Sequence, residues 1–321
     1  MDTVSVAFCF NNAFCHLAAA AIASLIRHAS PQVRYELYIV HDDISPYNQL
    51  LLGGLNDRDC VTIRFVSFSI TEVTDADLDY EQHTRYTFSR LFLHRVLPGL
   101  ERVLYLDADT VLTADVAALF HQDLCGHALG ACLDELSLLP PQQPCLVPRL
   151  RGYPYDTLHD YLHHHLGLAD DQTRAYFNAG VLLLDLRRAG AMLDRELPGL
   201  LKNRYLMGDQ DILNIIFSTD RQVLDSTYNV FAGDQVEDFI RARGHLPAVI
   251  HYNGNHKPCD EPSMTRAGNS AYWKALAGTD FYFQALERYI TARSALASQQ
   301  MTARTLRKLM PLLAGEHAGG R

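Results

Sequence analysis

The alternation of β-rich runs with helix-like segments limits the fold of this chain more than any other feature of its sequence. Val4 to Phe10 and Tyr35 to Val40 are β-rich, and the apolar segment Phe14 to His28 between them has helical character. A strand, a helix and a second strand in this order form a β-α-β unit, whose strands are parallel. The pattern predicts an α/β fold with a mainly parallel central sheet that helices cover on both faces. Ligands of such sheets bind beyond the carboxyl ends of the strands.

Later segments extend the alternation. The sequence predicts further strands at Val61 to Phe68, Arg102 to Leu106 and Phe177 to Leu186, and helices at Phe88 to Val96 and Asp209 to Phe217. The exception is Leu136 to Asp171, which is rich in Pro, His and Tyr. We interpret this segment as an irregular excursion over the sheet, and long segments of that kind are usually functional or mobile.

Composition narrows the class of protein. With 321 residues, of which 48% are apolar and 20% charged, the chain is long enough for one large domain plus an appendage. Its formal net charge of −9 argues against a nucleic-acid-binding protein, since that affinity comes from Lys and Arg at phosphates. The seven cysteines are scattered without a C-x-x-C pair, which favours a reducing compartment. Neither a signal peptide nor an apolar run of membrane-spanning length is apparent, so we expect a cytoplasmic protein.

The segment Leu104 to Asp109 carries the strongest chemical signal. A buried strand runs into Asp107 and Asp109, and Ala108 between them points away because side chains alternate along a strand. Both carboxylates can therefore face one point just past the end of the strand. Two oxygen anions at one point suit a hard divalent ion that carries a diphosphate. The alternative is that an isolated Asp-x-Asp forms a solvated turn.

Three other segments supply polar groups near predicted element ends. Asn178 and Gly180 precede an apolar strand, where the amide can face a site and the glycine permits close backbone approach. Gly208 to Asn214 places acidic and amide groups at a helix start, although its first acidic residue is also a typical N-cap. His251 follows the strand Ala248 to Ile250 and precedes a glycine turn and a lysine. A lone histidine at a strand end is more often structural, but the carboxylate pair lacks a third ligand.

Taken in chain order, these motifs resemble glycosyltransferase family 8, especially the bacterial lipopolysaccharide galactosyl- and glucosyltransferases. The likeness covers about residues 4 to 260. Besides the N-terminal strand and helix, it includes Ser89 to Leu91, Leu104 to Asp109, Tyr176 to Leu184, Asp209 to Asn214 and His251 to Pro258. The resemblance implies a GT-A fold, a UDP-sugar donor, dependence on Mn²⁺ or Mg²⁺, and retention of the α anomeric configuration.

The resemblance also implies roles for individual residues. The implied metal ligands are Asp107, Asp109 and His251. The implied donor-binding residues are Phe8, Asn11, Arg90, Asp107, Ala108, Asn178, Gly254 and Lys257. Gln210 resembles the residue nearest the anomeric carbon, with Asp209 and Asp134 as neighbouring acids, so these three are the candidate catalytic residues. Because an amide is a poor nucleophile, attack of the acceptor on the face that UDP leaves fits better than a covalent intermediate.

The chain departs from the family pattern near the end of the first strand and around the Lys-Pro pair, where Asn255 and His256 occupy normally smaller positions. Family members commonly place an acidic residue near the end of the first strand to bind the uracil or ribose, whereas this chain has Asn11, Asn12 and Ala13. Asparagine keeps hydrogen-bonding ability but loses the charge, which bears on uridine affinity and base choice. Cys259 replaces the aromatic residue that usually follows the Lys-Pro pair. Neither change affects the implied metal ligands.

The sequence thus predicts a retaining glycosyltransferase that moves galactose or glucose from a UDP-sugar to a saccharide acceptor in lipopolysaccharide core synthesis. A nucleotidyltransferase of similar fold would need a Gly-rich basic loop after the first strand, and Asn11 to Phe14 is not one. A glycogenin-like self-glucosylating enzyme and an inactive saccharide-binding protein remain as alternatives. The basic tail argues against the first of these two, and the complete set of implied ligands argues against the second.

We expect residues 1–285 to form the catalytic domain and residues 286–321 a basic helical tail. From Arg288 to Met310 the chain carries five basic residues and no acidic one. In related bacterial enzymes such a stretch makes peripheral contact with the inner membrane, and the alternative is a solvated helix on the domain. Leu136 to Asp171 is expected to form one wall of the acceptor site, with Arg149 and Arg151 meeting phosphates of a lipopolysaccharide core.

Overall fold

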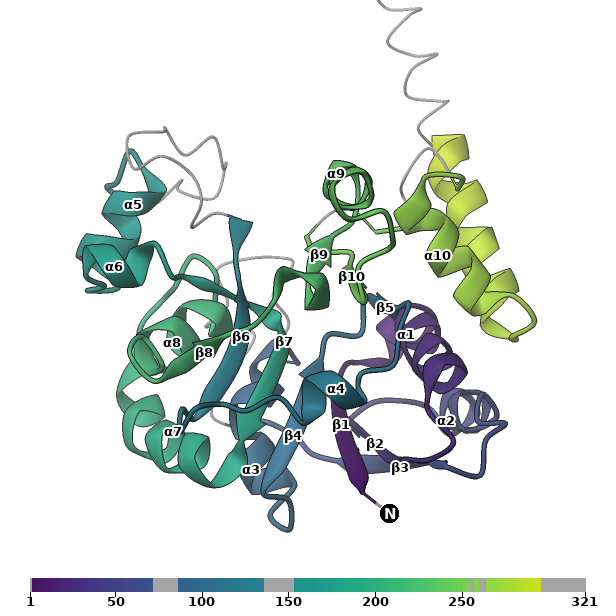
Figure 1. Ribbon diagram of the computed structural model, residues 1–321, viewed down its shortest axis with the longest axis horizontal. Helices are drawn as coiled ribbons and strands as arrows, with labels where there is room; N and C mark the ends of the chain where they lie inside the picture. The colour runs from purple at the N-terminus through teal and green to yellow at the C-terminus, as the bar shows by residue number, and fades with distance from the viewer. Residues whose placement is uncertain (1, 72–85, 136–152, 255–256, 260–263, 296–321) are drawn as a thin grey trace, which may run out of the picture.

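The central feature of the molecule is a seven-stranded sheet (Figure 1). The computed structural model describes residues 2–71, 86–135, 153–254, 257–259 and 264–295. The strands of this sheet, in chain order, are β1 Thr3–Cys9, β2 Arg34–His41, β3 Val61–Ser67, β4 Arg102–Leu106, β6 Leu129–Leu133, β7 Phe177–Asp185 and β8 Arg221–Val223. Their order across the sheet is β3-β2-β1-β4-β7-β6-β8.

The sheet is mainly parallel, as the sequence predicted. Strands β3, β2, β1 and β4 are parallel to one another, and β6 is parallel to β8. Strand β7 runs antiparallel to both β4 and β6. The amino end of β7 therefore lies at the edge where β4 ends, and this places Asn178 beside the Asp107 to Asp109 segment.

A second, three-stranded sheet extends this edge. Its strands are β5 Thr110–Leu112, β9 Val230–Phe231 and β10 Val249–His251, in the order β5-β10-β9. Strand β5 begins directly after Asp109, and β10 pairs antiparallel with it in a register that sets Thr110 opposite His251. The pairing brings the histidine to the carboxylates across a long stretch of sequence.

Because side chains alternate along each strand, the hydrophobic core lies in two parts, one on each face of the central sheet. Val6 and Phe8 of β1 pack on one face with helix α1, while Ala7 and Cys9 pack on the other. Near-continuous burial of β1 and β4 is expected for strands that helices cover on both faces. The first face carries α1 and α10, and the second carries η3, α3, α7 and α8.

The helices match the sequence analysis in some places and not in others. The described helices are α1 Cys15–His28, α2 Pro46–Gly53, η3 Thr87–Phe92, α3 Leu93–Val96, α4 Ala117–Phe120, α5 Leu158–Asp160, η6 Tyr161–His165, α6 Asp170–Thr173, α7 Leu186–Leu200, α8 Asp209–Ile216, α9 Asp234–Arg243, α10 Ala267–Leu276 and a helix over 281–295, with short 3₁₀ turns η1 Asn12–Phe14 and η7 Ser226–Tyr228. The single helix predicted for Phe88 to Val96 is a 3₁₀ turn followed by one α turn.

The segment Leu136 to Asp171 contains more regular structure than its composition indicated. Its described part, from residue 153 on, folds into α5, η6 and the start of α6. The Thr157 side chain accepts a hydrogen bond from Asp160 N and begins the first of these helices, an N-cap that the sequence analysis did not weigh. In Figure 1, α5 and α6 lie at the upper left, beside the upper end of β6, and α9 lies above the upper edge of the central sheet, where its parallel strands end.

The C-terminal helix over 281–295 crosses the position 285/286 where the basic tail was expected to begin. Residues 296–321, with most of the basic charge of that tail, lie outside the described residues, and so do Arg149 and Arg151. The division into a catalytic domain and a tail stays a prediction. None of the helices in the described ranges combines the length and the apolar character that a bilayer crossing requires.

Candidate active site

The carboxylates Asp107 and Asp109 follow β4 and face the same point. Ala108 between them is buried in the hydrophobic core, so its side chain points away from both. The backbone here is held on two sides, because Asp107 N donates to Gly180 O and Tyr252 N donates to Asp109 O. The two carboxylates are therefore fixed by the central sheet and by the small sheet together.

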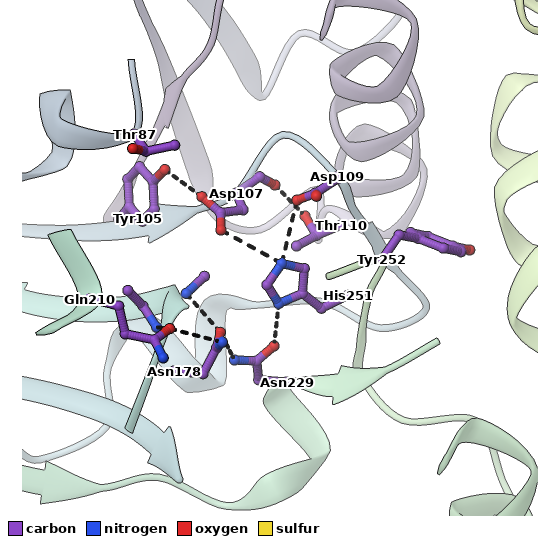
Figure 2. A network of polar contacts seen from close by, with 12 residues as sticks. Thr87, Tyr105, Asp107, Asp109, Thr110, Asn178, Gln210, Asn229, His251 and Tyr252 are labelled. Atoms are coloured by element: carbon purple, nitrogen blue, oxygen red, sulfur yellow. Dashed lines mark hydrogen bonds and ion pairs between the residues drawn. The ribbon is translucent and has the colours of Figure 1, made fainter. Parts of the chain in front are cut away.

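His251 completes a cluster of three ligand-type side chains (Figure 2). Its Nε2 lies 3.6 Å from Asp107 Oδ2 and 3.4 Å from Asp109 Oδ1. One ligand atom from each of the three residues lies within 4.8 Å of the others. Two carboxylate oxygens and one imidazole nitrogen at this spacing fit a divalent cation such as Mn²⁺.

Gly180 makes this convergence sterically possible. A Cβ atom at Gly180 would lie 2.7 Å from His251 Nδ1 and 2.9 Å from Asp107 Oδ2. Any larger residue would have to displace the imidazole or the carboxylate. The close approach of backbone to side chain that the sequence analysis assigned to this glycine is thus present, and its neighbours are the implied metal ligands.

Lys257 contacts the cluster from the turn after β10. Its Nζ pairs with Asp109 Oδ2 and also donates to Tyr252 O, 2.7 Å away. Burial on its own would raise the pKa of Asp109, but the positive charge of Lys257 and the neighbouring His251 imidazole outweigh it and hold that pKa well below its ordinary value. The ionised form of Asp109 is therefore favoured, which suits a metal ligand.

Arg90 links the cluster to Asp209. Its guanidinium is buried, lies 2.9 Å from Asp107 Oδ1 and 2.9 Å from Asp209 Oδ2, and donates to Ala179 O at 2.6 Å. The Nε–H group points to Thr87 O at 2.9 Å, so the Asp209 contact is an ion pair and not an aligned hydrogen bond. Burial raises the pKa of Asp209 to about 6, against the opposing charge of Arg90. Arg90 thus pairs with both acids in this structure, and the contact with the donor that the resemblance implied stays a prediction.

Gln210, Asn178 and Asp134 form a second polar group beside the metal-ligand cluster (Figure 2 shows the two amides). Gln210 Oε1 accepts from Ala179 N at 3.0 Å and from Asn178 Nδ2 at 3.1 Å. Its Nε2 donates to Asp134 Oδ2 at 3.2 Å and to the Tyr176 hydroxyl at 3.3 Å. These contacts hold the Gln210 amide in one orientation, as a preorganised dipole must be held.

Helix α8 is fixed from below this group by the buried carboxylate of Asp211. Tyr176 donates to Asp211 Oδ1 at 2.6 Å, and Tyr161 of η6 donates to Asp211 Oδ2 at 2.7 Å. Met207 N adds a third hydrogen bond to Oδ2 at 2.8 Å. The segment Leu136 to Asp171, an insertion that carries Tyr161, is thereby bonded to the helix that begins with Asp209 and Gln210.

Three of the implied donor-binding residues stand apart from these contacts. Phe8 is fully buried in the core, so only its backbone can reach a ligand. Asn11 caps the short helix η1, with its Oδ1 accepting from Phe14 N. Gly254 has a φ of +63° in the turn after β10, a conformation that glycine adopts readily.

Sequence reasoning did not identify three residues that the structure places in the site. Tyr105 donates to Asp107 Oδ1 at 2.6 Å, Tyr176 contacts Gln210, and Asn229 contacts both His251 and Asn178. The two tyrosines lie in or beside apolar strands, where they read as ordinary core residues. Asn229 precedes a two-residue strand and gives no signal in a single sequence.

The fold is that of a GT-A glycosyltransferase. The solved structure of the bifunctional glycosyltransferase WbbM aligns with a TM-score of 0.72 and 21% identity, covering 89% of this chain and 52% of that one. The galactosyltransferase LgtC, solved with donor and acceptor sugar analogs, aligns with a TM-score of 0.62 and 24% identity, covering 86% of this chain and 96% of that one.

The chain belongs to glycosyl transferase family 8, whose profile matches residues 5–261. Glycosyltransferase GlyF of Streptococcus pneumoniae serotype 4 is 27% identical over 82% of this chain and 58% of its own length. The lipopolysaccharide 1,2-glucosyltransferase of Escherichia coli K12 is 28% identical over 54% of this chain and 49% of its own length. The chain thus spans about half the length of these two relatives.

Proposed function

We propose that the protein is a metal-dependent, retaining glycosyltransferase that moves a hexose, galactose or glucose, from a UDP-sugar to a saccharide acceptor. The observation that carries this proposal is the convergence of Asp107, Asp109 and His251 from two sheets, with their ligand atoms within 4.8 Å of one another. An arrangement of this kind, beside a lysine and at the carboxyl edge of a parallel sheet, suits a metal-bound diphosphate.

Asp107, Asp109 and His251 would hold the metal. Carboxylates suit both Mg²⁺ and Mn²⁺, and the imidazole nitrogen favours the softer Mn²⁺. A bound cation supplies positive charge that stabilises the departing diphosphate. Lys257 adds a second positive charge on the same side, since its ammonium already lies against Asp109.

Gln210 is the residue we place nearest the anomeric carbon. It carries no nucleophilic oxygen anion, so attack of the acceptor hydroxyl on the face that UDP leaves fits its chemistry. The new bond joins the acceptor oxygen to the anomeric carbon while the bond from that carbon to the diphosphate oxygen breaks. The electron pair stays with the diphosphate, whose oxygen takes the hydroxyl proton. Gln210 would stabilise the positive charge that develops on the sugar, and Asp209 and Asp134 would contact sugar hydroxyls.

The acceptor side of the site would be formed by the insertion from Leu136 to Asp171, and we propose a lipopolysaccharide core as the acceptor. In support, the described part of this insertion carries aromatic and imidazole side chains, among them Tyr155 stacked with His164. Rings of this kind pack against sugar faces. The helices α5 and α6 of the insertion lie beside the upper end of β6 in Figure 1. The name of the Escherichia coli relative points to the same acceptor class.

The basic tail would bring the enzyme to the cytoplasmic face of the inner membrane, where such acceptors are made. The C-terminal helix over 281–295 supports this proposal, because Phe283 and Ile290 are 74% and 55% exposed, seven positions apart and so on one side of the helix. Exposed apolar side chains next to basic residues are typical of helices at a membrane surface.

The direct test is the release of UDP from a panel of UDP-sugars in the presence of Mn²⁺, first without acceptor. We expect release from UDP-galactose or UDP-glucose, and none with a chelator. Asp109→Asn is the control, because it should abolish Mn²⁺-dependent UDP binding in calorimetry while the protein stays folded. Unchanged UDP affinity in that variant would contradict the metal site, and a hexose found on the protein itself would favour a self-glucosylating enzyme.

A further inference from the structure

Asn229 lies between the two polar groups of the site and contacts both. It is 8% exposed and follows the turn η7, directly before β9. Its Oδ1 lies 2.9 Å from His251 Nδ1, and its Nδ2 donates to Asn178 Oδ1, also at 2.9 Å (Figure 2). Asn178 in turn contacts Gln210 and Asp134, so Asn229 connects the metal-ligand cluster with the candidate catalytic amide.

A backbone group sets the direction of this chain of hydrogen bonds. Gly180 N–H can only donate, and it points at Asn178 from 2.9 Å, so the atom it meets must be Oδ1. That oxygen can only accept from Asn229, which therefore presents its NH₂ group to Asn178. The remaining amide atom of Asn229, its oxygen, then faces His251. Each orientation follows from the one before it.

The last step fixes the tautomer of the histidine. Asn229 Oδ1 can only accept, so His251 Nδ1 must carry the proton. In the neutral imidazole the Nε2 lone pair is then directed at the gap shared with Asp107 and Asp109. A neutral ring with an Nε2 lone pair is the form that binds a metal, and its other nitrogen normally donates to an oxygen of the protein.

The backbone N–H group of Ala179 fixes the orientation of the Gln210 amide in the same way. Ala179 N–H donates to Gln210 and identifies the accepting atom as Oε1, so the Gln210 NH₂ group faces Asp134. The N–H groups of Ala179 and Gly180, at the start of β7, thus orient the side-chain amides of Gln210 and Asn178. The metal ligand and Gln210 are set by the same stretch of strand.

We propose that Asn229 is a positioning residue for the reaction. It holds His251 in the Nδ1–H tautomer for metal binding and couples that ligand to the Asn178 and Gln210 amides. This inference rests on the proposed metal-dependent function. A carboxamide fits the role because it accepts from one partner and donates to the other, whereas a carboxylate cannot donate and an apolar residue does neither.

The backbone around Asn229 is built to keep it in place. Asp225 caps η7 by accepting from Thr227 N at 2.8 Å, and the Thr227 hydroxyl accepts from Ala248 N at 3.1 Å. Beyond Asn229, strand β9 pairs with β10, and Ala232 N donates to His251 O at 2.8 Å. Hydrogen bonds on both sides of Asn229 therefore join its turn to the strand that presents His251.

The first test is Mn²⁺ binding without donor, measured by calorimetry or by the loss of the free-ion electron paramagnetic resonance signal. We expect Asn229→Ala and the volume-matched Asn229→Leu to bind Mn²⁺ about 10- to 100-fold more weakly than wild type, the usual effect of losing an outer partner of a histidine ligand. Asn203→Ala, at an exposed asparagine outside these contacts, should bind as wild type does. Wild-type Mn²⁺ affinity in a folded Asn229→Leu protein would overturn the proposal.

Asn229→Asp separates the two parts of the role. The carboxylate still accepts from His251 Nδ1–H, so Mn²⁺ affinity should stay within about threefold of wild type. Its second oxygen, however, faces Asn178 Oδ1 without a hydrogen, so kcat should fall at least tenfold with Mn²⁺ saturating. A residue that merely filled space would leave kcat as it is in wild type, and that result would contradict the coupling to Asn178.

Nuclear magnetic resonance tests the tautomer without metal and without any Asn229 variant. In ¹⁵N-histidine-labelled, chelator-treated protein above pH 8, His251 should show the Nδ1–H pattern, with its signal identified among the 15 histidines by its loss in His251→Gln. An Nε2–H pattern would overturn the proposal even if every Asn229 variant failed to fold. Failure of the proposed function would give a different result, because the wild-type protein itself would then bind no Mn²⁺.

Discussion

At the scale of single residues, the arrangement of the implied metal ligands depends on the absence of a side chain at Gly180. Gly180→Ala adds a methyl group that would lie within 3 Å of both His251 Nδ1 and Asp107 Oδ2, closer than such atoms approach. We expect a loss of about 1–3 kcal/mol in the free energy of unfolding, the usual cost of overpacking, together with at least tenfold weaker Mn²⁺ binding. Urea unfolding and calorimetry would measure the two effects.

Gly199→Ala is the matched control for this variant. Gly199 lies in α7, and a Cβ there would meet nothing within 4 Å. The substitution should leave Mn²⁺ binding unchanged and stabilise the protein by up to about 1 kcal/mol, since alanine is the better helix former. Equal Mn²⁺ affinity in both glycine variants would mean that the site tolerates a side chain at Gly180.

Gln210 allows a prediction about mechanism. If its amide only stabilises the positive charge of the transition state, Gln210→Ala should lower kcat by about 10² to 10³, or roughly 2.7–4 kcal/mol, with KM for the UDP-sugar nearly unchanged. Steady-state kinetics with saturating Mn²⁺ would measure both constants. A hexosyl adduct on Asp209 or Asp134, trapped by mass spectrometry during turnover, would require double displacement instead.

At the scale of secondary-structure elements, the insertion and helix α8 are joined through one hydroxyl group. Tyr161 OH donates to the buried Asp211 and accepts from Leu206 N at 2.7 Å. Tyr161→Phe leaves both partners in the interior with one hydrogen bond fewer, so we expect a loss of about 2–4 kcal/mol in the free energy of unfolding. Urea unfolding would measure it, with Tyr47→Phe as control because Tyr47 is 65% exposed. Equal stability of the two variants would show that the insertion is held by packing alone.

The observed bounds of the strands and helices also show which segments a sequence pattern predicts correctly. The strand Arg102 to Leu106 was predicted with the bounds it has, and β1, β2, β3, β7 and α8 lie within a residue or two of their predicted bounds. Long, apolar, periodic runs specify local structure almost independently of context. The segment Phe88 to Val96 is not one α-helix, because residues 87–92 form a 3₁₀ turn. In that turn the buried Arg90 pairs with Asp107 and Asp209, long-range contacts that a spacing pattern does not contain.

At the scale of the whole molecule, the proposed metal joins two sheets. Asp107 and Asp109 follow β4 of the central sheet, while His251 ends β10 of the small one. A cation that binds only the folded chain stabilises it, so Mn²⁺ at 100 times its dissociation constant should raise the free energy of unfolding by about 2.7 kcal/mol. Thermal unfolding with Mn²⁺ and with a chelator would measure the shift. Asp109→Asn should show none, and a shift of equal size in that variant would place the ion elsewhere.

The sequence by itself determined the α/β class, the strand that ends in Asp107 and Asp109, and the residue types of the proposed metal and diphosphate site, because strand periodicity and terminal carboxylates are local properties. Only the tertiary structure decided which side chains meet. His251 reaches the carboxylates through the pairing of β10 with β5, Arg90 pairs with Asp107 and Asp209, and Asn229 lies between His251 and Asn178. These contacts join residues far apart in the chain, and their geometry depends on strand order and register, which a single sequence does not contain.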